Sequence, residues 1–354
     1  MAAEMDVWAL TEWNKPMEKI KQPIPTPTGS EVLIRVTHAG LCHSDLHFAE
    51  GFHDMGGGQR IYLKDRGAKL PIALGHEILG DVVSTGPDAT GLEEGSRQIV
   101  YPWLGCGNCT RCRQNQDNLC GEQKGLGYVA HGGFAEYVMV PHPKYLFAAG
   151  DLDPSVACTY GCSGLTTFNA VSKVMPLPPD EPVLLIGAGG LGLAAISVLK
   201  SYGHKNIIST DLNDERLAVA AKAGAKTVNT SGTDASKKIL EATGGPVIAV
   251  IDFVNSSGTA AMINNELIAR GAKWVQVGVM GGSIEMSLVA NTFRALSIDS
   301  VIVGDLQQMR AVTDLAKNGK LSPVPVQEMP WDGVNGAMDL LSQGKATGRI
   351  VLVK

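Results

Sequence analysis

The fold is decided by the residues Val183-Leu184-Leu185-Ile186-Gly187-Ala188-Gly189-Gly190-Leu191-Gly192. The uncharged apolar run predicts a buried strand over 183–186, and Leu191–Tyr202 is predicted as the helix that follows it. In such a strand–turn–helix unit, Gly187 allows the tight turn, Gly189 lets the backbone approach a pyrophosphate, and Gly192 allows close packing. The free N–H groups at the helix start favour phosphate binding. The pattern therefore predicts a dinucleotide site.

Asp211 indicates which dinucleotide fits. It follows the next predicted strand, 206–210, where a carboxylate can hold ribose hydroxyls. Its charge repels a 2′-phosphate, and Leu212 and Asn213 bring no arginine beside it, so NAD is favoured over NADP. We expect NAD to be held by Gly187, Gly189, Gly190, Leu191, Gly192 and Asp211.

The rest of the chain predicts an α/β fold with an inserted domain. Predicted strands in the middle of the chain are 183–186, 206–210, 227–228, 247–252, 273–279 and 298–303, with helices at 214–223, 235–242 and 259–268 between them. This alternation is typical of a doubly wound parallel sheet. The first 150 residues and the tail from about Ser322 instead predict short strands. We expect a mostly β domain of residues 1–155, a dinucleotide-binding domain of 156–294, and a last segment, 295–354, that adds one strand and returns to the β domain.

Composition narrows the class of protein. The chain has 354 residues and a net charge of −5, which argues against nucleic acid or an anionic membrane as a partner. Seven cysteines, an odd number, do not fit a secreted disulfide scaffold, and the first residues lack a signal-peptide pattern. We expect a cytoplasmic protein whose cysteines are reduced or bound to metal.

Four cysteines follow the pattern Cys106-x2-Cys109-x2-Cys112-x7-Cys120. Short Cys-x2-Cys steps let neighbouring thiolates converge on one tetrahedral ion, which zinc prefers. Ferredoxins use similar steps for iron–sulfur clusters, but their last cysteine usually precedes proline, whereas Gly121 follows here. We predict a zinc lobe over about 103–122, and because four protein ligands leave no open position, a structural one.

The other cysteines suggest a second metal site. They are Cys42, Cys158 and Cys162, and Gly75-His76-Glu77 adds a histidine. A catalytic zinc typically has three protein ligands and an open position, and two cysteines with one histidine form a known set. Spacing alone leaves the choice open between Cys158 and Cys162, and between His47 and His76.

The sequence resembles the zinc-dependent medium-chain alcohol dehydrogenases over essentially its whole length. The matching segments are 40–45, 75–77, the four-cysteine lobe, 162–166, 187–192 and 348–351. The resemblance implies a GroES-like β domain and oxidation of primary or secondary alcohols to aldehydes or ketones, with hydride transfer from a zinc-bound alkoxide to NAD+. It also implies that Cys42, His76 and Cys162 hold the catalytic zinc, so we expect two zinc ions per chain, with Cys158 left as a spare.

The resemblance assigns further roles. Ser44 takes the proton from the alcohol, and His47 is the far end of that relay. Asp45 orients the ring of His76, and Glu77 lies beside the metal. On the cofactor side, the implied residues are His43 and Arg349 at the pyrophosphate, Arg216 at the adenosine ribose, and Val277, Gly278 and Val279 at the nicotinamide carboxamide.

Several alternatives stay open at this point. The segment at about 52–68 is longer than in compact members of the family, and it either gates the cleft or contacts a neighbouring subunit. Trp103 either lines the pocket or packs at the base of the domain. We expect a homo-oligomer, and favour a tetramer over a dimer.

Two other functions compete with a general alcohol dehydrogenase. A polyol or amino-alcohol dehydrogenase of the same family often has an acid as the third metal ligand, which Cys162 argues against. A zinc-binding scaffold without redox activity would not need the second metal set or the dinucleotide pattern.

Overall fold

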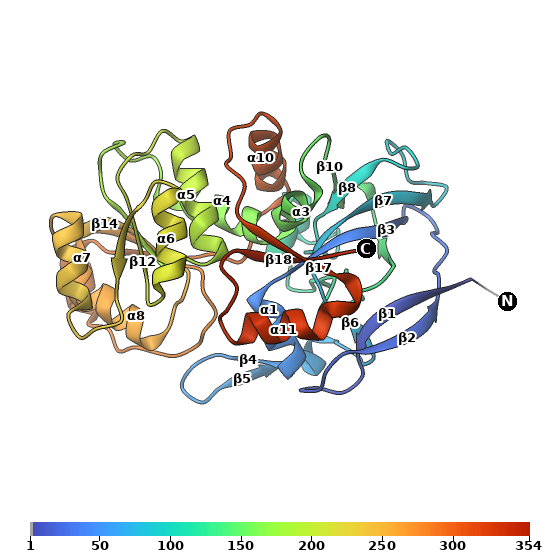
Figure 1. Cartoon of the computed structure of the whole chain (residues 1–354), viewed down its shortest axis with the longest axis horizontal. Coiled ribbons are helices and arrows are strands. Elements are labelled where there is room, and N and C mark those ends of the chain that lie inside the picture. The colour runs from blue at the N-terminus through green and yellow to red at the C-terminus, as the bar shows by residue number, and fades with distance from the viewer. Residues whose placement is uncertain (1–2) are drawn as a thin grey trace.

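The computed structural model describes residues 3–354, and Figure 1 shows a mostly β part at the right beside an α/β part at the left. A seven-stranded sheet forms the centre of the β part, in the order β10-β8-β7-β3-β18-β17, with β9 pairing with β3. Its strands are β3 (Val32–Leu41), β7 (Glu77–Thr85), β8 (Arg97–Val100), β9 (Tyr137–Val140), β10 (Leu146–Ala148), β17 (Val326–Pro330) and β18 (Arg349–Val353).

The end of the chain returns to this sheet. Strand β18 pairs antiparallel with β3, so that Ile350 lies opposite Leu41 and Val353 opposite His38. This register brings Arg349, the first residue of β18, close to the end of β3, where Cys42 follows. The α/β part is therefore inserted in the β part, as predicted.

Smaller elements surround the β sheet. A three-stranded sheet and a two-stranded hairpin lie beside it, with short helices between the strands. These elements are β1 (Glu4–Leu10), β2 (Glu18–Pro23), β6 (Ile72–Ala73), the hairpin strands β4 (Phe52–Asp54) and β5 (Arg60–Tyr62), α1 (His43–Glu50), α2 (Thr110–Arg113), α3 (Pro154–Ala157) and α11 (Val334–Ser342).

The α/β part is a six-stranded parallel sheet in the order β13-β12-β11-β14-β15-β16. Its strands are β11 (Val183–Ile186), β12 (Ile207–Asp211), β13 (Lys226–Asn229), β14 (Val247–Asp252), β15 (Ile268–Gln276) and β16 (Ser297–Ser300). The accompanying helices are α4 (Ser163–Val174), α5 (Gly190–Ser201), α6 (Asp214–Lys222), α7 (Ala235–Thr243), α8 (Ser257–Met262), α9 (Leu288–Arg294) and α10 (Leu306–Lys317). This order is that of a doubly wound dinucleotide-binding domain, so the predicted fold class is confirmed. The domain limits near residues 155 and 294 stay a prediction.

Several elements differ from the prediction: β16 ends at Ser300 instead of residue 303, and helices α4 and α10 were not predicted. Strand β15 ends at Gln276 instead of Val279, because the N–H groups of the next two residues both donate to the carbonyl of Asp252 and leave the sheet ladder. Helix α8 ends at Met262 and a π-helical turn leads to Leu267. Helix α9 was not predicted: it is seven residues long and has no buried residue, so none of its side chains belongs to the core.

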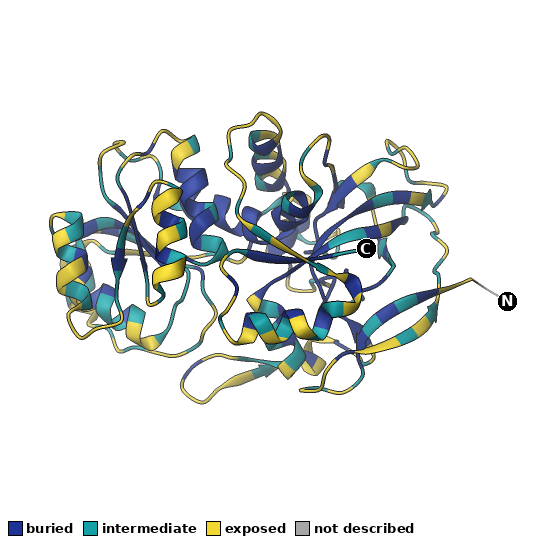
Figure 2. Ribbon diagram, in the orientation of Figure 1, coloured by how far each residue is buried: buried dark blue, intermediate teal, exposed yellow. Residues whose placement is uncertain are grey.

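The core explains why the two parts hold together. One apolar cluster runs through both and takes Val183 and Leu185 from β11, while a second cluster takes Leu184 and Ile186 from the other face. Figure 2 shows these buried positions along the central strands and the inner faces of α4 and α5, whereas α6 and α7 expose many residues. A search of residues 3–354 finds no helix with the length and apolar character needed to cross a bilayer.

Candidate active site and metal centres

Three residues from distant segments form a buried cluster between the two parts. Cys42 lies between β3 and α1, His76 directly precedes β7, and Cys162 directly precedes α4. All three are buried, and their ligand atoms lie within 4.8 Å of one another. The structure therefore brings together the three residues that the resemblance implied and leaves Cys158 and His47 out of the group.

Asp45 fixes the orientation of His76. Its Oδ1 accepts hydrogen bonds from His76 Nδ1 and from the backbone N–H of Gly75, each at 3.1 Å, while its Oδ2 accepts from the N–H of Cys42 at 2.9 Å. The carboxylate is fully buried. His76 Nε2 is also buried and has no hydrogen-bond partner. An unpartnered nitrogen is costly in the interior, so this atom is well suited to a metal ion.

The charges in the cluster also suit a cation. A hydrogen bond with the thiol of Cys162, more than any other contact, holds the pKa of Cys42 well below its usual range, although burial opposes this shift. Burial would lower the pKa of His76, but the charge of Asp45 and its hydrogen bond, together with the charge of Cys42, raise it well above its usual range. The cluster thus binds a proton tightly, and a divalent ion would replace it. Two thiolates and an imidazole are a ligand set of catalytic zinc sites, which keep a fourth position open.

Glu77 and Arg349 form a buried ion pair beside this cluster. Glu77 Oε1 lies 2.5 Å from Arg349 Nη2 and accepts the backbone N–H of Ser163 at 3.1 Å. Burial raises the pKa of Glu77, although Arg349 opposes the shift. Gly40 on β3 lies opposite Glu77 on β7. A side chain at Gly40 would not fit, because its Cβ would overlap Glu77 Oε2. That oxygen is buried and without a partner.

Helix α1 carries the residues predicted to move a proton. Ser44 Oγ lies 3.7 Å from Cys42 Sγ, and His47 lies one turn further along the same helix. Both side chains are partly exposed, and His47 Nδ1 lies 3.5 Å from Glu50 Oε2. His43 is exposed at the start of the helix. The helix therefore provides a series of hydroxyl and imidazole groups leading from the buried cluster towards solvent.

Aromatic rings surround His76. The rings of Phe48 and Trp103 approach the His76 ring edge-on, with centroids 5.7 Å and 5.5 Å away, and Tyr128 stacks on Phe48 at 5.0 Å. Trp103 Nε1 donates to the carbonyl of Gly161 at 3.1 Å, which fixes its indole. The position of Trp103 favours a role beside the cluster. Phe48 and Tyr128 were missed by the sequence analysis.

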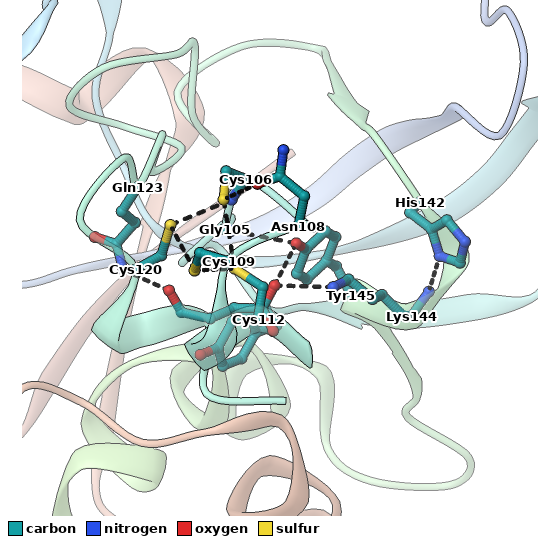
Figure 3. A network of polar contacts seen from close by, with 12 residues as sticks. Gly105, Cys106, Asn108, Cys109, Cys112, Cys120, Gln123, His142, Lys144 and Tyr145 are labelled. Atoms are coloured by element: carbon teal, nitrogen blue, oxygen red, sulfur yellow. Dashed lines mark hydrogen bonds and ion pairs between the residues drawn. The ribbon is translucent and has the colours of Figure 1, made fainter. Parts of the chain in front are cut away.

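The four-cysteine lobe forms a second cluster, in which the sulfurs of Cys106, Cys109, Cys112 and Cys120 converge (Figure 3). Sulfur–sulfur distances are 3.5 Å for Cys109–Cys112, 3.9 Å for Cys109–Cys120 and 4.0 Å for Cys106–Cys112. Tetrahedral zinc with bonds of about 2.3 Å requires sulfurs about 3.8 Å apart, so the lobe fits zinc. A hydrogen bond with the Cys112 backbone, followed by one with its thiol, lowers the pKa of Cys109 to about 7. All four ligand positions are protein, as in structural sites.

Asp117 attaches this lobe to the β part. Its fully buried Oδ1 accepts hydrogen bonds from Tyr145 OH at 2.7 Å and from Lys144 Nζ at 2.8 Å. Tyr145 also accepts the backbone N–H of Gly105 at 3.2 Å, next to Cys106. Figure 3 shows Lys144 and Tyr145 beside the sulfur cluster. The network holds the start of the lobe to the sheet.

The glycine-rich turn has the geometry of a phosphate-binding loop. Gly187 has φ +99°, and a Cβ on Gly192 would overlap the carbonyl oxygen of Gly187. A Cβ on Gly189 would meet no atom within 4 Å, so the space above it is free. Asp211 Oδ2 accepts the N–H of Ala188 at 2.9 Å. These positions suit a dinucleotide at the start of α5.

The other residues predicted to bind the cofactor lie outside the glycine-rich turn. Arg349 packs against Gly190, and Arg216 Nη2 donates to the carbonyl of Gly344 at 2.7 Å. Val277 is buried and Val279 is exposed, in the loop after β15.

The sequence analysis missed two residues that shape the loop after β15. Asn255 Nδ2 donates to the carbonyl of Gly278 at 3.0 Å, and Asp252 accepts the N–H groups of Val254 and Asn255. An aspartate at the end of predicted strand 247–252 was the available signal.

A dinucleotide-type sheet beside a buried cysteine–histidine set defines a nucleotide-linked, metal-binding dehydrogenase. Residues 28–151 match the family model of the alcohol dehydrogenase GroES-like domain, and residues 190–318 match that of zinc-binding dehydrogenases. The NAD-dependent alcohol dehydrogenase of Sulfurisphaera tokodaii is 38% identical over 352 residues, covering 99% of this chain and 100% of the relative. That of Saccharolobus solfataricus is 37% identical over 349 residues, covering 97% and 98%.

Solved structures agree with these matches. The alcohol dehydrogenase of Aeropyrum pernix is 28% identical and superposes with a TM-score of 0.89. The alignment covers 99% of this chain and 100% of that one. The chain belongs to the zinc-dependent medium-chain alcohol dehydrogenase family. The predicted class of enzyme, an alcohol dehydrogenase and so an oxidoreductase, is confirmed.

Proposed function

We propose that the chain catalyses the reversible oxidation of primary or secondary alcohols to aldehydes or ketones, with NAD as hydride acceptor and two zinc ions per chain. The buried cluster of Cys42, His76 and Cys162 carries this proposal, since His76 Nε2 has no hydrogen-bond partner and is free to bind a metal ion. A zinc ion bound there and NAD, when present, supply a Lewis acid for the alcohol oxygen and an acceptor for hydride.

The side chains around the cluster prepare this chemistry. Asp45 holds the His76 ring with Nε2 turned towards the two thiols, and Glu77 keeps a free carboxylate oxygen beside them. Ser44 Oγ accepts the proton of the alcohol hydroxyl while its own hydroxyl proton moves on towards a ring nitrogen of His47, which passes a proton to solvent. The position of both residues on α1 supports this relay.

The cofactor is proposed to lie along the start of α5. Its contacts would be Gly187, Gly189, Gly190, Leu191 and Gly192 at the pyrophosphate with His43 and Arg349, Asp211 and Arg216 at the adenosine ribose, and Val277, Gly278 and Val279 at the nicotinamide. The free space above Gly189 and the carboxylate at the end of β12 support this placement. The absence of an added positive charge next to Asp211, in Leu212 and Asn213, supports NAD rather than NADP.

The aromatic rings beside His76 favour alcohols with an apolar carbon chain. Phe48, Trp103 and Tyr128 present ring surfaces there, while a polyol needs hydrogen-bond partners for several hydroxyls. A cysteine as the third ligand, Cys162, also argues against the polyol and amino-alcohol alternatives.

Self-association is proposed along the outer edge of the six-stranded sheet. Strand β16 is the last strand there, and Ile298 on it is 41% exposed. Helix α9 before it exposes Leu288 by 81% and Phe293 by 73%. Apolar side chains beside the edge strand of a sheet favour a second copy, related by a two-fold axis. A tetramer, and a cytoplasmic location, stay predictions.

A pair of variants tests the proposed function. Purified protein is assayed for NADH formation, by absorbance, with primary, secondary, cyclic and aromatic alcohols. Cys162→Ala is expected to lose one zinc ion and the turnover, whereas Cys158→Ala keeps both. Cys158 is the matched control because it is also a fully buried cysteine, outside the cluster. Full turnover of Cys162→Ala would contradict the proposal.

A further inference from the structure

The β4–β5 hairpin reaches from the β part to the α/β part of the same chain. At its tip, Asp54 and Gly56 lie against Gly281 and Gly282, in the loop that follows β15. Figure 1 shows the hairpin below α1 and α11, pointing towards that loop beside α8. We name these four residues the clasp. The sequence left open whether the segment at 52–68 gates the cleft or contacts a neighbouring subunit. In the structure, its tip contacts another part of the same chain.

The contact at the clasp is a close approach of two backbones. A Cβ on Gly56 would overlap the carbonyl group of Gly282, and one on Gly281 would lie 3.4 Å from the Cβ of Asp54. Gly56 is buried, although its neighbours from Asp54 to Arg60 are exposed (Figure 2). The loop after β15 is what covers it. Only glycine at this position permits the approach.

The loop side of the clasp is anchored to its own domain. The Oγ of Ser257, at the start of α8, accepts the N–H of Ser283 at 2.9 Å, and Gly281 forms a bridge with Ser256. The loop therefore has a defined position next to Val277–Val279, the segment proposed to contact the nicotinamide.

The hairpin side is anchored at its base. Its turn is closed by Asp54 Oδ1, which accepts the N–H of Gly56 at 2.8 Å. At the base, Leu63 donates its N–H to the carbonyl of Gly51 at 2.9 Å. The His53 ring meets that of Phe48 on α1 edge-on at 5.6 Å.

Nothing polar holds the two sides together. Within residues 3–354, no hydrogen bond or ion pair joins the hairpin to the loop 277–283, so van der Waals contact alone closes the clasp. A contact of this kind can open without breaking a polar interaction.

The clasp spans the space between the two halves of the proposed site. On one side, α1 carries Ser44 and His47 immediately before the hairpin. On the other, the loop begins at the carboxyl end of β15, where ligands of doubly wound sheets bind. A dinucleotide that extends from the start of α5 to Val277–Val279 would end next to the clasp.

We propose that the clasp is a gate for the cofactor: it opens to admit NAD and closes over the nicotinamide end, so its opening limits cofactor exchange. This inference rests on the NAD site of the proposed function. It makes Gly56 and Gly282 the residues that set the rate of NADH release, although neither lies in the phosphate-binding turn.

Two glycines of the hairpin give a matched test. Gly56 and Gly58 have nearly equal backbone angles, φ +78° and +77°, but a Cβ on Gly58 would meet no atom within 4 Å. Gly56→Ala and Gly58→Ala thus share the same left-handed strain, and only Gly56→Ala pushes the clasp apart. We expect Gly56→Ala to release NADH about fivefold faster or more, in stopped-flow fluorescence, since overpacking of this size has effects of that order. Gly58→Ala is expected to release it at the wild-type rate.

An engineered disulfide tests the opposite change. The Cβ separation of 3.4 Å between positions 54 and 281 lies just below the usual disulfide range of about 3.5–4.5 Å, so a small opening of the clasp lets Asp54→Cys and Gly281→Cys cross-link. The native cysteines are in the two metal clusters, apart from the fully buried Cys158. We expect the oxidised double variant to exchange NADH slowly and to recover with dithiothreitol. Each single variant, oxidised in the same way with its zinc content measured, is the control.

The outcomes separate the gate from the site. Equal NADH release by Gly56→Ala and Gly58→Ala, or unchanged exchange after cross-linking, would overturn the gate while leaving the NAD site intact. Failure of the two cysteines to cross-link would overturn it too, because the clasp would then not close in solution. A wild-type protein that binds no NADH would overturn both the gate and the proposed function.

Discussion

Replacement of Asp45 by asparagine tests how the buried histidine is held for the metal. The carboxylate accepts three hydrogen bonds, from His76 Nδ1, from the N–H of Gly75 and from the N–H of Cys42. Asparagine has nearly the same shape but only one accepting oxygen. With that oxygen towards His76, its NH2 group faces the N–H of Cys42, and both of these buried donor groups are left without an acceptor.

The size of the effect follows from these contacts. An unpaired buried donor costs about 1–3 kcal/mol, and the hydrogen bond to His76 also loses its charge. Loss of such an orienting partner typically weakens metal binding about 10- to 100-fold. We therefore expect Asp45→Asn to bind zinc at the cluster of Cys42, His76 and Cys162 about 10- to 100-fold more weakly.

Competition with a colorimetric zinc chelator measures this change. The four-cysteine lobe is an internal reference, because it shares no ligand with Asp45 and should release its zinc at the wild-type rate. Asp180→Asn is the surface control, since Asp180 is exposed. Zinc affinity and turnover equal to those of Asp180→Asn would refute the role of Asp45.

Other changes probe the cofactor turn, the lobe and the half-buried His131. Gly189→Ala should weaken NADH binding in a titration without lowering the melting temperature, because its Cβ meets no protein atom. Gly192→Ala should lower both the NADH affinity and the melting temperature, because its Cβ would overlap the carbonyl oxygen of Gly187. An equal loss of melting temperature in the two variants would contradict this. Cys109→Ser should release one zinc ion and lower the melting temperature, and a variant that keeps two ions would show that the lobe does not bind zinc. His131 accepts the N–H of Ala73 at 3.1 Å, and burial lowers its pKa. The folded protein should therefore lose stability as the pH falls below about 6.5, and the urea midpoint of His131→Gln should fall less between about pH 7.5 and about pH 5.5. An equal fall would contradict it.

The parts of the account that depend on neighbouring residues could be predicted from the sequence. The strand over 183–186 and the turn from Gly187 to Gly192 are local, and so are the steps between Cys106, Cys109 and Cys112. Each of these patterns is short, because the residues that share a site also follow one another along the chain. The fold class follows from the same local alternation of strands and helices.

The parts that depend on distant residues could not be predicted from local patterns, and the choice of Cys162 rested on the family resemblance alone. Cys158 and Cys162 are four positions apart, and only the packing at the start of α4 decides which sulfur faces Cys42. The contact between Gly56 and Gly282 joins segments more than half the chain apart, and neither segment has a pattern that indicates the other. Helix α9 was missed as well; it is short, and none of its residues is buried.

We propose that the chain has two different zinc sites, of which only the cluster of Cys42, His76 and Cys162 takes part in turnover. Zinc per chain and NAD-dependent turnover, measured on the same preparations of wild type and Cys42→Ala, test it most directly. We expect two zinc ions and turnover for the wild type, and one zinc ion, a folded chain and no turnover for Cys42→Ala. Two zinc ions with full turnover in Cys42→Ala would contradict it.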